Sequence, residues 1–529
     1  MFHSPLTNTI AYTNTGGYAG TALKLAGFDG FTVSGRSSRP KYILVKKGEI
    51  TLVDCDWLWG KRATDTMNAL REKHGDVRVL SIGPAGENMV RYANVVNDSG
   101  RASGVRHGVG CLLGGMKLKA IAISSDYGLR LPVADKDRFR ELLVKLNKKI
   151  QNSPLLNRDT GSFSIYGTPL AVEPLIQNEA LPVKNYSSSP SYEGNLNLTG
   201  KKMSETILIN RLTCNSCPVQ CRRETGNVSK YTNFRVEGPD YAQISSLGSN
   251  CGLENLEDVA YLNFLCYELG LDPIETGNLL AIYAEGIQSG KVKPQSIALR
   301  WNDPGGMIKL VELIAQRKGD GAILAEGADA LIESLGDDNL STSVKGITIQ
   351  NTDPRVEPAW GLLNATENSG ASIHIWVYPD LIYSFRKIPG LKSLLQNEPE
   401  DPTQLARQVI QKQNQVAVFD SLQICAFSAM AFDLDDYLAA INSVTGWSWD
   451  ENDLARTGER IFNLERRFDN FAGIEKDTLP RKFTVEQINV GRHAGRVCDI
   501  EPLLQEYYLQ RGWNDGVVNS KKLEELQLA

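Results

Sequence analysis

The order of apolar and polar residues divides the chain into a strand-rich start and a helix-rich remainder. Up to about residue 125, short apolar runs alternate with glycine turns, and the clearest runs are residues 42–45, 77–80 and 118–123. Short apolar runs bounded by glycine are typical of β-strands. We therefore predict a β-rich N-terminal domain.

From Asp135 onward, apolar residues recur with helical spacing. Positions three and four residues apart share one helix face, and an apolar face usually packs against the core. Two such stripes are predicted to face the core. They comprise Leu256, Val259, Ala260 and Phe264 in the first stripe, and Ile461, Leu464 and Phe468 in the second. The acid–base alternation of residues 458–466 predicts a salt-bridged helix face, and residues 187–190 are expected to form a polar loop.

The predicted fold class is α+β. The chain has 529 residues, which is enough for roughly three domains. We expect a β-rich domain at residues 1–130, followed by two mainly α-helical domains at residues 131–345 and 346–529. The cysteine motif described below falls in the first helical domain.

Composition excludes several classes of protein. The net charge of -5 is spread without a basic stripe, so neither nucleic acid nor anionic lipid is an expected partner. No window approaches the ~18 consecutive apolar residues of a membrane-spanning helix, and the first residues lack the pattern of a signal peptide. We expect a cytoplasmic protein without a membrane anchor. Nine cysteines are too sparse for a disulfide scaffold and favour metal binding.

Three cysteines fall within eight residues, at Cys214, Cys217 and Cys221. Their two-then-three spacing suits three corners of an iron–sulfur cube, whose fourth thiolate then comes from elsewhere. The alternatives are a zinc site, which usually has a second close pair of ligands, or three unligated thiols. Spacing alone leaves the fourth ligand open among the remaining cysteines, which are Cys55, Cys111, Cys251, Cys266, Cys425 and Cys498.

Motifs along nearly the whole chain resemble the tungsten-dependent aldehyde:ferredoxin oxidoreductase family. In that family a bis-pyranopterin tungsten centre lies beside a [4Fe-4S] cluster. The resemblance is carried by the cysteine motif and by Thr-Asn-Thr-Gly-Gly-Tyr at 13–18, Leu-Ala-Gly-Phe-Asp-Gly at 25–30, Ile-Gly-Pro-Ala-Gly-Glu-Asn at 82–88, Arg-His-Gly-Val-Gly at 106–110, Leu-Pro-Val-Lys-Asn-Tyr at 181–186, Glu-Gly-Pro-Asp-Tyr at 237–241 and Leu-Gly-Ser-Asn-Cys-Gly at 247–252. It implies a pterin-binding function for the N-terminal domain.

The family's two pterin motifs read Asp-x-x-Gly-Leu-Asp and Asp-x-x-Gly-Leu-Cys. Here they appear as Tyr-Glu-Leu-Gly-Leu-Asp at 267–272 and Asp-Ser-Leu-Gln-Ile-Cys at 420–425. The resemblance implies that Asp272 and Asp420 accept hydrogen bonds from the pterins and that Cys425 is the fourth cluster ligand. This chain departs from the pattern at Tyr267, whose phenol is not an anionic acceptor, and at Gln423, where the family has glycine.

The resemblance also nominates residues for the remaining roles. Asn14 and Arg106 are expected near the pterin phosphates and a bridging ion, for which Mg²⁺ is the candidate. Aldehyde oxidation needs a proton acceptor near the metal, and the candidates are Glu237, Asp240 and His374. His374 ends a glycine-containing stretch, residues 364–374, that resembles the family.

The leading hypothesis is an enzyme that oxidises aldehydes to carboxylic acids at a tungsten or molybdenum bis-pyranopterin centre. Electrons would pass through one [4Fe-4S] cluster to ferredoxin. A second hypothesis is a family-related reductase subunit with another substrate, and a third is a truncated, cofactor-free iron–sulfur binding protein. Family members have further strands before the segment that begins this chain, so we expect a longer protein and an incomplete first sheet with an unpaired edge. A homodimer is one open alternative for the assembly.

Overall fold

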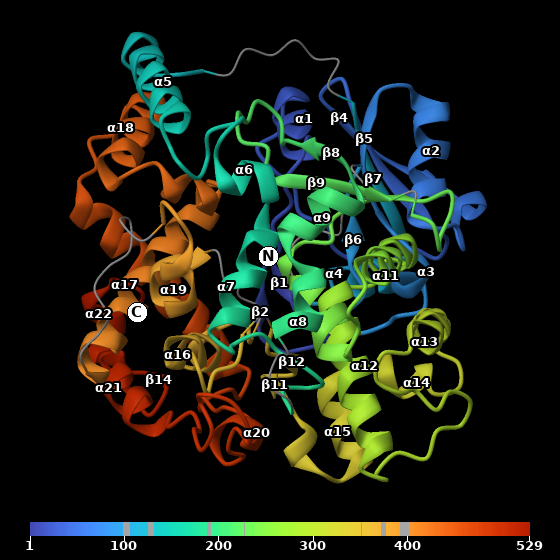
Figure 1. Ribbon diagram of the computed structural model, residues 1–529. Coiled ribbons are helices and arrows are strands. Elements are labelled where there is room, and N and C mark those ends of the chain that lie inside the picture. Colours follow the sequence, from blue (N-terminus) through green and yellow to red (C-terminus); the bar gives the residue numbers. More distant parts are fainter. Residues whose placement is uncertain are drawn as a thin grey trace.

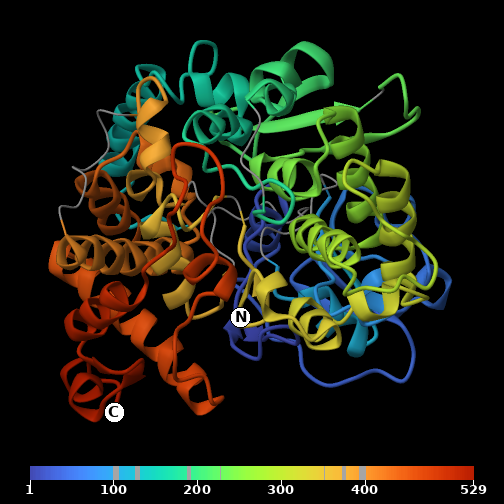
Figure 2. The same ribbon diagram turned by 60° about the horizontal axis from the view of Figure 1, so that its bottom comes forward.

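The computed structural model describes residues 1–98, 106–124, 132–187, 192–226, 228–350, 352–371, 377–391 and 401–529. Figure 1 shows a sheet with its flanking helices on one side and the C-terminal helices on the opposite side. In Figure 2 the N-terminal segment again lies between these two parts. Strands β1 (Phe2–His3) and β2 (Ile10–Ala11) form this central segment. The chain therefore starts in the middle of the molecule.

The N-terminal part is built on a five-stranded sheet of order β4-β3-β7-β5-β6. Its strands are β3 (Lys41–Lys46), β4 (Glu49–Asp54), β5 (Val77–Ile82), β6 (Val95–Val96) and β7 (Leu118–Ser124). The central strand β7 runs parallel to β3 and antiparallel to β5. The predicted strands at 42–45, 77–80 and 118–123 are all confirmed.

The two faces of this sheet are covered by different helices. Tyr42 packs with Met67 and Leu70 of α2 (Ala63–His74), whereas the next residue, Ile43, packs with Ala19 and Ala22 of α1 (Ala19–Leu25). Successive side chains of a strand point to opposite faces, which explains this division. Strand β4 forms one edge of the sheet, where Ile50 and Leu52 are exposed.

Helices make up most of the remaining chain. Helix α5 (Lys136–Gln151) begins after Asp135, whose side chain accepts a hydrogen bond from the Arg138 backbone N–H, as an N-cap residue does. Long helices further along are α11 (Leu256–Leu269), α12 (Pro273–Gln288), α13 (Pro304–Gln316), α17 (Pro402–Ser421), α18 (Leu434–Thr445), α19 (Glu451–Phe471) and α21 (Glu501–Arg511). Shorter helices are α3 (Pro84–Glu87), α4 (Val109–Gly115), α6 (Ser162–Tyr166), α7 (Val172–Gln177), α8 (Tyr192–Asn195), α9 (Gly200–Thr206), α10 (Tyr241–Gln243), α14 (Gly321–Leu324), α15 (Ala328–Leu335), α16 (Pro358–Thr366), α20 (Arg481–Thr484) and α22 (Ser520–Glu525). The helical remainder is confirmed.

Small sheets interrupt the helices, and the sequence did not predict them. Strands β8 (Leu208–Leu212), β9 (Arg222–Gly226) and β10 (Arg235–Glu237) form an antiparallel sheet. The connection from β8 to β9 is the cysteine segment, so a hairpin holds the three thiols. Two further hairpins pair β11 (Ser343–Val344) with β12 (Ile347–Thr348), and β13 (Trp513–Asn514) with β14 (Val517–Val518). The polar loop predicted at 187–190 lies largely outside the described residues.

Close backbone contact joins the N-terminal sheet to the helical part. The Asn94 N–H donates to the Gly270 carbonyl at 2.7 Å, and Ala93 forms an isolated bridge with Leu271. A Cβ atom on Gly83 would lie 2.3 Å from the Leu269 carbonyl carbon. Only glycine permits this approach. It fixes the end of α11, and hence the start of α12, against the N-terminal part.

The two predicted apolar stripes have different outcomes. Helix α11 is confirmed as a core helix, with Leu256, Val259 and Ala260 buried. The prediction for α19 is wrong, because Leu464 is 51% and Phe468 38% exposed. Polar residues of α19 face inward instead, and one of them, Arg466, forms a buried ion pair with Asp477. These inward residues include Asn463, Glu465, Arg466 and Asp469.

Candidate functional site

The predicted cluster cysteines come together from two distant segments. Cys214, Cys217 and Cys221 are partly buried in the β8–β9 connection, and Cys425 is exposed at the start of the 3-10 helix Ala426–Met430. Protein atoms that shield part of the Cys425 thiol raise its pKa to about 11, and the nearby Cys217 and Cys214 thiols add to the rise. Cys425, the proposed fourth ligand, thus lies near Cys214 and Cys217.

The backbone of Gly16 and Gly17 packs closely against Cys214. The Gly17 N–H donates to Cys214 Sγ at 3.3 Å, and a Cβ atom on Gly16 would lie 3.0 Å from the same sulfur. Arg222 Nη1 lies 4.0 Å from Cys214 Sγ and donates to the Thr213 carbonyl at 3.0 Å. Donors of this kind stabilise a thiolate and tune the potential of a metal centre bound to it.

Within the described ranges, no group of three or more His, Cys, Asp or Glu side chains is placed to hold a single metal ion. A cubane differs from a single ion because each of its irons takes one thiolate. Its cysteines surround the cluster and do not converge on one point. The arrangement of the four cysteines is therefore compatible with the predicted cluster.

Two predicted cofactor residues from opposite ends of the chain meet directly. Asn14 Nδ2 donates to Asp420 Oδ1 at 3.0 Å, and the Tyr12 hydroxyl also hydrogen-bonds to Asp420. Burial raises the pKa of Asp420, while these two hydrogen bonds oppose the shift. Because Asp420 lies in the last turn of α17 and Cys425 follows it, one short segment carries both a predicted pterin residue and a predicted cluster ligand.

The other predicted pair, Arg106 and Asp272, lies at the start of α12. Asp272 caps this helix by accepting from the Glu275 N–H at 2.6 Å, and Arg106 Nε lies 3.7 Å from Asp272 Oδ1. The Arg106 guanidinium also forms an ion pair with Glu275 and donates to the Thr348 carbonyl at 2.7 Å. Burial raises the pKa of Asp272 to about 6 despite the nearby Arg106 charge.

Unpaired buried polar atoms around these residues fit a polar cofactor. Arg106 Nε, both ring nitrogens of His107 and Thr13 Oγ1 are buried and have no hydrogen-bond partner in the described structure. Burial lowers the pKa of His107 to about 3, so its imidazole is neutral with one donor and one acceptor. Pyranopterins offer amide edges and phosphates that such atoms can bind. The residues present therefore fit the cofactor that the motifs imply.

The candidate proton acceptors lie in less suitable places. Glu237 is 3% exposed and accepts from Arg222 Nε at 2.5 Å, so a guanidinium already occupies its carboxylate. Asp240 caps α10 and forms a capping box with Gln243. Through Arg222, Glu237 is linked to the cysteine loop. His374 lies outside the described residues.

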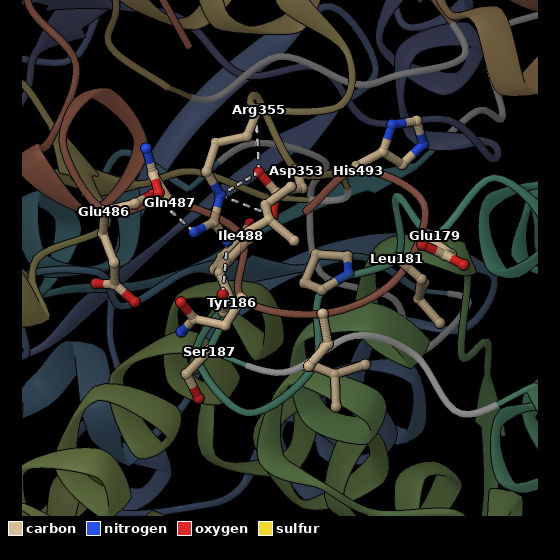
Figure 3. Close-up of a pocket in the computed structure, with 14 residues that line it drawn as sticks. Glu179, Leu181, Tyr186, Ser187, Asp353, Arg355, Glu486, Gln487, Ile488 and His493 are labelled. Carbon is tan, nitrogen blue, oxygen red and sulfur yellow. Dashed lines mark hydrogen bonds and ion pairs between the residues drawn. The ribbon is translucent and has the colours of Figure 1, made fainter. Parts of the chain in front are cut away.

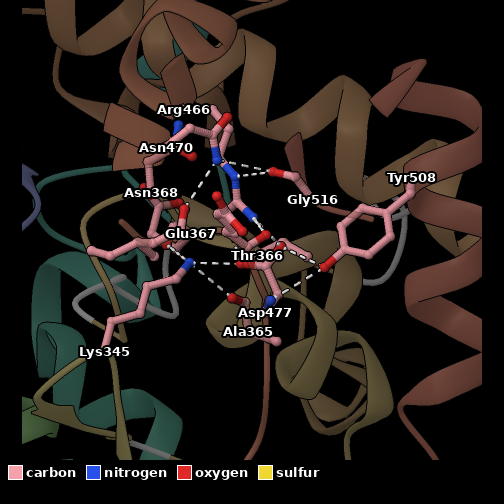
Figure 4. Close-up of polar contacts among 12 residues, drawn as sticks. Lys345, Ala365, Thr366, Glu367, Asn368, Arg466, Asn470, Asp477, Tyr508 and Gly516 are labelled. Atoms are coloured by element: carbon pink, nitrogen blue, oxygen red, sulfur yellow. Dashed lines mark hydrogen bonds and ion pairs between the residues drawn. The ribbon is translucent and has the colours of Figure 1, made fainter. Parts of the chain in front are cut away.

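Sequence reasoning missed a group of buried carboxyls around Asp420. Burial raises the pKa of Glu367 to about 7, of Glu465 to about 8 and of Asp469 to about 6, and repulsion from neighbouring carboxyls adds to each shift. Figure 4 shows Glu367 beside Lys345, Arg466 and Asp477. Glu367 belongs to the stretch 364–374 that was nominated for His374, but nothing in the sequence distinguished it from a surface acid.

A separate hollow lies away from these residues (Figure 3). It has a cavity volume of about 20 Å³ and contains the Arg355–Asp353 ion pair, whose Nη2–Oδ2 distance is 2.7 Å. A volume of this size holds about one water molecule. This hollow is therefore too small for an organic substrate. Across the described part of the chain, no helix is long and apolar enough to cross a membrane.

Comparison with known proteins covers the whole length of the chain. The model for the N-terminal domain of aldehyde ferredoxin oxidoreductase matches residues 1–125, and that for domains 2 and 3 of the same enzyme matches residues 141–528. The chain is 35% identical to the tungsten-containing aldehyde ferredoxin oxidoreductase of Pyrococcus furiosus and 34% identical to that of Thermococcus kodakarensis. Both alignments cover 99% of this chain and 86% of the relative.

More distant similarities include proteins with other reactions. The chain is 25% identical to an aliphatic sulfonate oxidoreductase, WOR-like subunit, of Pyrococcus furiosus, over 99% of this chain and 84% of that protein. Its fold matches the active-site complex of benzoyl coenzyme A reductase, solved with 1,5-dienoyl-CoA, with a TM-score of 0.80 and 20% identity. That match covers 99% of this chain and 85% of the solved one. The two family models and the relatives above 30% identity show that the chain belongs to the aldehyde ferredoxin oxidoreductase family.

Proposed function

We propose that the protein oxidises an aldehyde with water to a carboxylic acid, releasing two protons and two electrons, and that ferredoxin receives the electrons one at a time. The balanced half-reaction is RCHO + H₂O → RCOOH + 2H⁺ + 2e⁻. The observation that carries the proposal is the short segment 420–425. It joins Asp420, which Asn14 contacts, to Cys425, which lies near Cys214 and Cys217.

A tungsten bis-pyranopterin and one [4Fe-4S] cluster would supply the redox chemistry, because the hard electron chemistry of such enzymes belongs to the cofactor. The pterins would be held by Asp272, Asp420, Asn14 and Arg106. Molybdenum is the alternative to tungsten, and a bridging Mg²⁺ is a further ion to be tested. Cys214, Cys217, Cys221 and Cys425 would hold the cluster. The curated relatives above 30% identity are described as tungsten-containing, which favours tungsten.

The chain's own residues have separable tasks. The pair Arg222–Glu237 orients a guanidinium toward Cys214 and so adds positive charge beside the predicted cluster. Cys425 is the exposed member of the four cysteines, so electrons would leave there toward ferredoxin. His374, Glu237 and Asp240 stay candidates for the proton acceptor, with Glu237 and Asp240 limited by the partners described above.

The first experiment is elemental analysis combined with a dye assay. Purified protein should contain iron and tungsten and should reduce a viologen dye only when an aldehyde is added. Iron without tungsten or molybdenum would favour an iron–sulfur binding protein, and zinc alone would reject both readings. Iron and tungsten without aldehyde-dependent dye reduction would contradict the proposed substrate class.

The cluster ligands can be tested separately from activity. Cys425→Ser should lose most of the cluster iron, together with its electron paramagnetic resonance signal, because a serine hydroxyl is a poor substitute for a thiolate. Cys55→Ser is the matched control, since Cys55 is buried in the N-terminal part, in the core between the sheet and α2. Equal iron content in the two variants would remove Cys425 from the ligand set.

A second candidate function is reduction of another substrate in a larger assembly. Tyr267 is buried where the family's motif has aspartate, and Gln423 stands where the family has glycine. Gln423 has a φ of 57°, a conformation that favours glycine, and its Nε2 donates to the Asp420 carbonyl at 2.8 Å. Both substitutions border the predicted cofactor site. Dye oxidation by a coenzyme A thioester, without aldehyde activity, would support this function.

A further inference from the structure

Four carboxyl groups gather at the predicted second pterin motif. Asp420 ends α17, Glu367 follows α16, and Glu465 and Asp469 lie one turn apart on α19. Glu367 is 4%, Glu465 8% and Asp469 0% exposed. Among the described residues, none of the four forms an ion pair with lysine or arginine.

The nearby cations, Lys345 and Arg466, form their ion pairs with a different acid, Asp477. Lys345 Nζ lies 2.9 Å from Asp477 Oδ1, and it donates to the main-chain carbonyl of Glu367 at 2.7 Å, not to its carboxylate. Arg466 binds Asp477 through both carboxylate oxygens, at 2.7 and 3.0 Å. Figure 4 shows both cations turned toward Asp477. Lys345 therefore attracts Glu367 and Asp469 without an ion pair, and burial with repulsion still raises the pKa of Glu367 and Glu465. Repulsion between buried acids is relieved when one of them takes a proton.

An unpaired polar atom lies in the same group. Asn368 is 1% exposed, and its Nδ2 donates to Glu465 Oε2 at 3.3 Å and to the Phe462 carbonyl at 3.0 Å. Its Oδ1 has no hydrogen-bond partner, and neither does Asp469 Oδ2. Two buried acceptors without donors require proton-bearing neighbours, such as water or a protonated carboxyl.

We propose that Glu367 and Glu465 form a proton-transfer pair that accepts the protons released at the reaction centre and passes them, one at a time, toward solvent. This inference rests on the proposed function. Each aldehyde releases two protons while the cluster removes two electrons singly, so a group that holds one proton between electron steps matches the stoichiometry. Asp420, which hydrogen-bonds to Tyr12 and Asn14 of the predicted cofactor site, acts on both carboxyls of the pair through its charge.

The charged and titratable groups around the pair define its behaviour. They are Asp420 on α17, Asp469 and Arg466 on α19, Tyr12 after β2, and Tyr378, Lys345 and Asp477 on the connecting segments. The pKa values of Glu367 and Glu465, about 7 and about 8, place the pair's protonation change near neutral pH. A general acid or base works best when its pKa is near the working pH. In this proposal Glu367 and Glu465 hold and pass on protons.

Infrared spectroscopy tests the pair without any assay of activity. Full-length protein at neutral pH should show the C=O stretch of a protonated carboxylic acid, which disappears as the pH is raised. Glu465→Gln should remove most of this band, and Glu367→Gln should lower the pH at which the remainder is lost, because the Glu367 charge then no longer raises the pKa of Glu465. Glutamine has the shape of a protonated glutamate, so both variants are expected to fold. A band unchanged by both substitutions would overturn the inference.

A kinetic test uses the holoenzyme with an aldehyde and a viologen dye. Glu465→Gln should lower kcat by about tenfold or more, with KM, tungsten content and iron content unchanged, because only proton transfer is removed. Glu465→Asp should recover part of kcat and shift the pH profile. Glu459→Gln is the control, since Glu459 on the same helix pairs with Lys522 at 2.7 Å at the surface.

The outcomes separate the two proposals. If wild-type protein does not oxidise aldehydes, the proposed function fails while the infrared result still reports on the pair. If wild-type protein is active and Glu465→Gln keeps the wild-type kcat and pH profile, the proton-transfer pair is wrong. If kcat falls equally in the glutamine and aspartate variants with no change in pH profile, the residue has a structural role only.

Discussion

The two predicted pterin motifs place their carboxylates in opposite electrostatic settings. At the first motif, Asp272 and Glu275 share the buried Arg106, which is 1% exposed. At the second, Asp420 is hydrogen-bonded by the neutral Asn14 and Tyr12 and is surrounded by Glu367, Glu465 and Asp469. One half of the site pairs its buried carboxylates directly with a cation, whereas the carboxyls of the other half form no ion pair among the described residues and take up protons more readily.

This difference separates two roles, which are anchoring of the cofactor and transfer of protons. A buried ion pair is rigid, because removing either partner leaves an uncompensated charge. A group of buried acids without a cation changes its protonation with small changes in its surroundings. We infer that the first motif anchors its part of the cofactor, while the second also handles protons. The following predictions test this contrast, from the largest expected effect to the smallest.

Arg106→Met should destabilise the protein by about 3–5 kcal/mol, since it leaves Glu275 buried without its cation. Chemical denaturation with urea measures this loss. The double variant Arg106→Met with Glu275→Gln should recover a large part of it, because no buried charge then remains unpaired. Glu465→Gln should not destabilise the protein at neutral pH. Equal losses of stability in Arg106→Met and Glu465→Gln would contradict the contrast between the two motifs.

Gly83→Ala should cost about 2–3 kcal/mol, because its methyl group would overlap the Leu269 backbone and push α11 and α12 from the N-terminal part. The loss should be accompanied by reduced cofactor content, since Asp272 moves relative to Arg106. Gly20→Ala in α1 is the matched control. Its Cβ would meet nothing within 4 Å, so it should be neutral or slightly stabilising. Similar stability of both variants would contradict the tight junction.

The pH dependence of stability should be shallower in Glu465→Gln. The pKa of Glu465 is raised to about 8 in the folded protein, whereas an unfolded glutamate has a pKa of about 4.3. Between these values the folded state binds more protons than the unfolded state, so the stability from this group falls as pH rises. The slope is about 1.4 kcal/mol per pH unit for one proton. Urea unfolding at pH 5 to 8.5 measures it, and an unchanged slope in the variant would refute the assignment.

Short-range patterns predicted the regular elements well. The runs at 42–45, 77–80 and 118–123 became β3, β5 and β7, and α5 begins directly after Asp135, where the helical spacing was predicted to start. These features depend on periodicity and on local turn and cap chemistry, which the sequence displays directly. The β8–β9 hairpin was missed because its strands, with Asn210 and Arg223 among their residues, are too polar to stand out.

The inward face of α19 could not be predicted. Leu464 and Phe468 form an apolar stripe that local rules assign to the core, yet they are exposed, while Arg466 is 0% exposed. Arg466 is buried because Asp477 binds it and because its guanidinium lies 5.0 Å from the centre of the Trp513 ring. A single helical pattern contains no information about such partners.

The sequence by itself determined the strand-rich start, the helical remainder, the close spacing of Cys214, Cys217 and Cys221, and the family motifs. All of these follow from residue type and local spacing. Only the tertiary structure decided that Asn14 contacts Asp420, that Arg222 pairs with Glu237, and that Glu367 and Glu465 are buried near each other with no ion pair among the described residues. The physical reason is that burial and long-range charge set the state of a carboxyl, and both arise only when distant segments pack together.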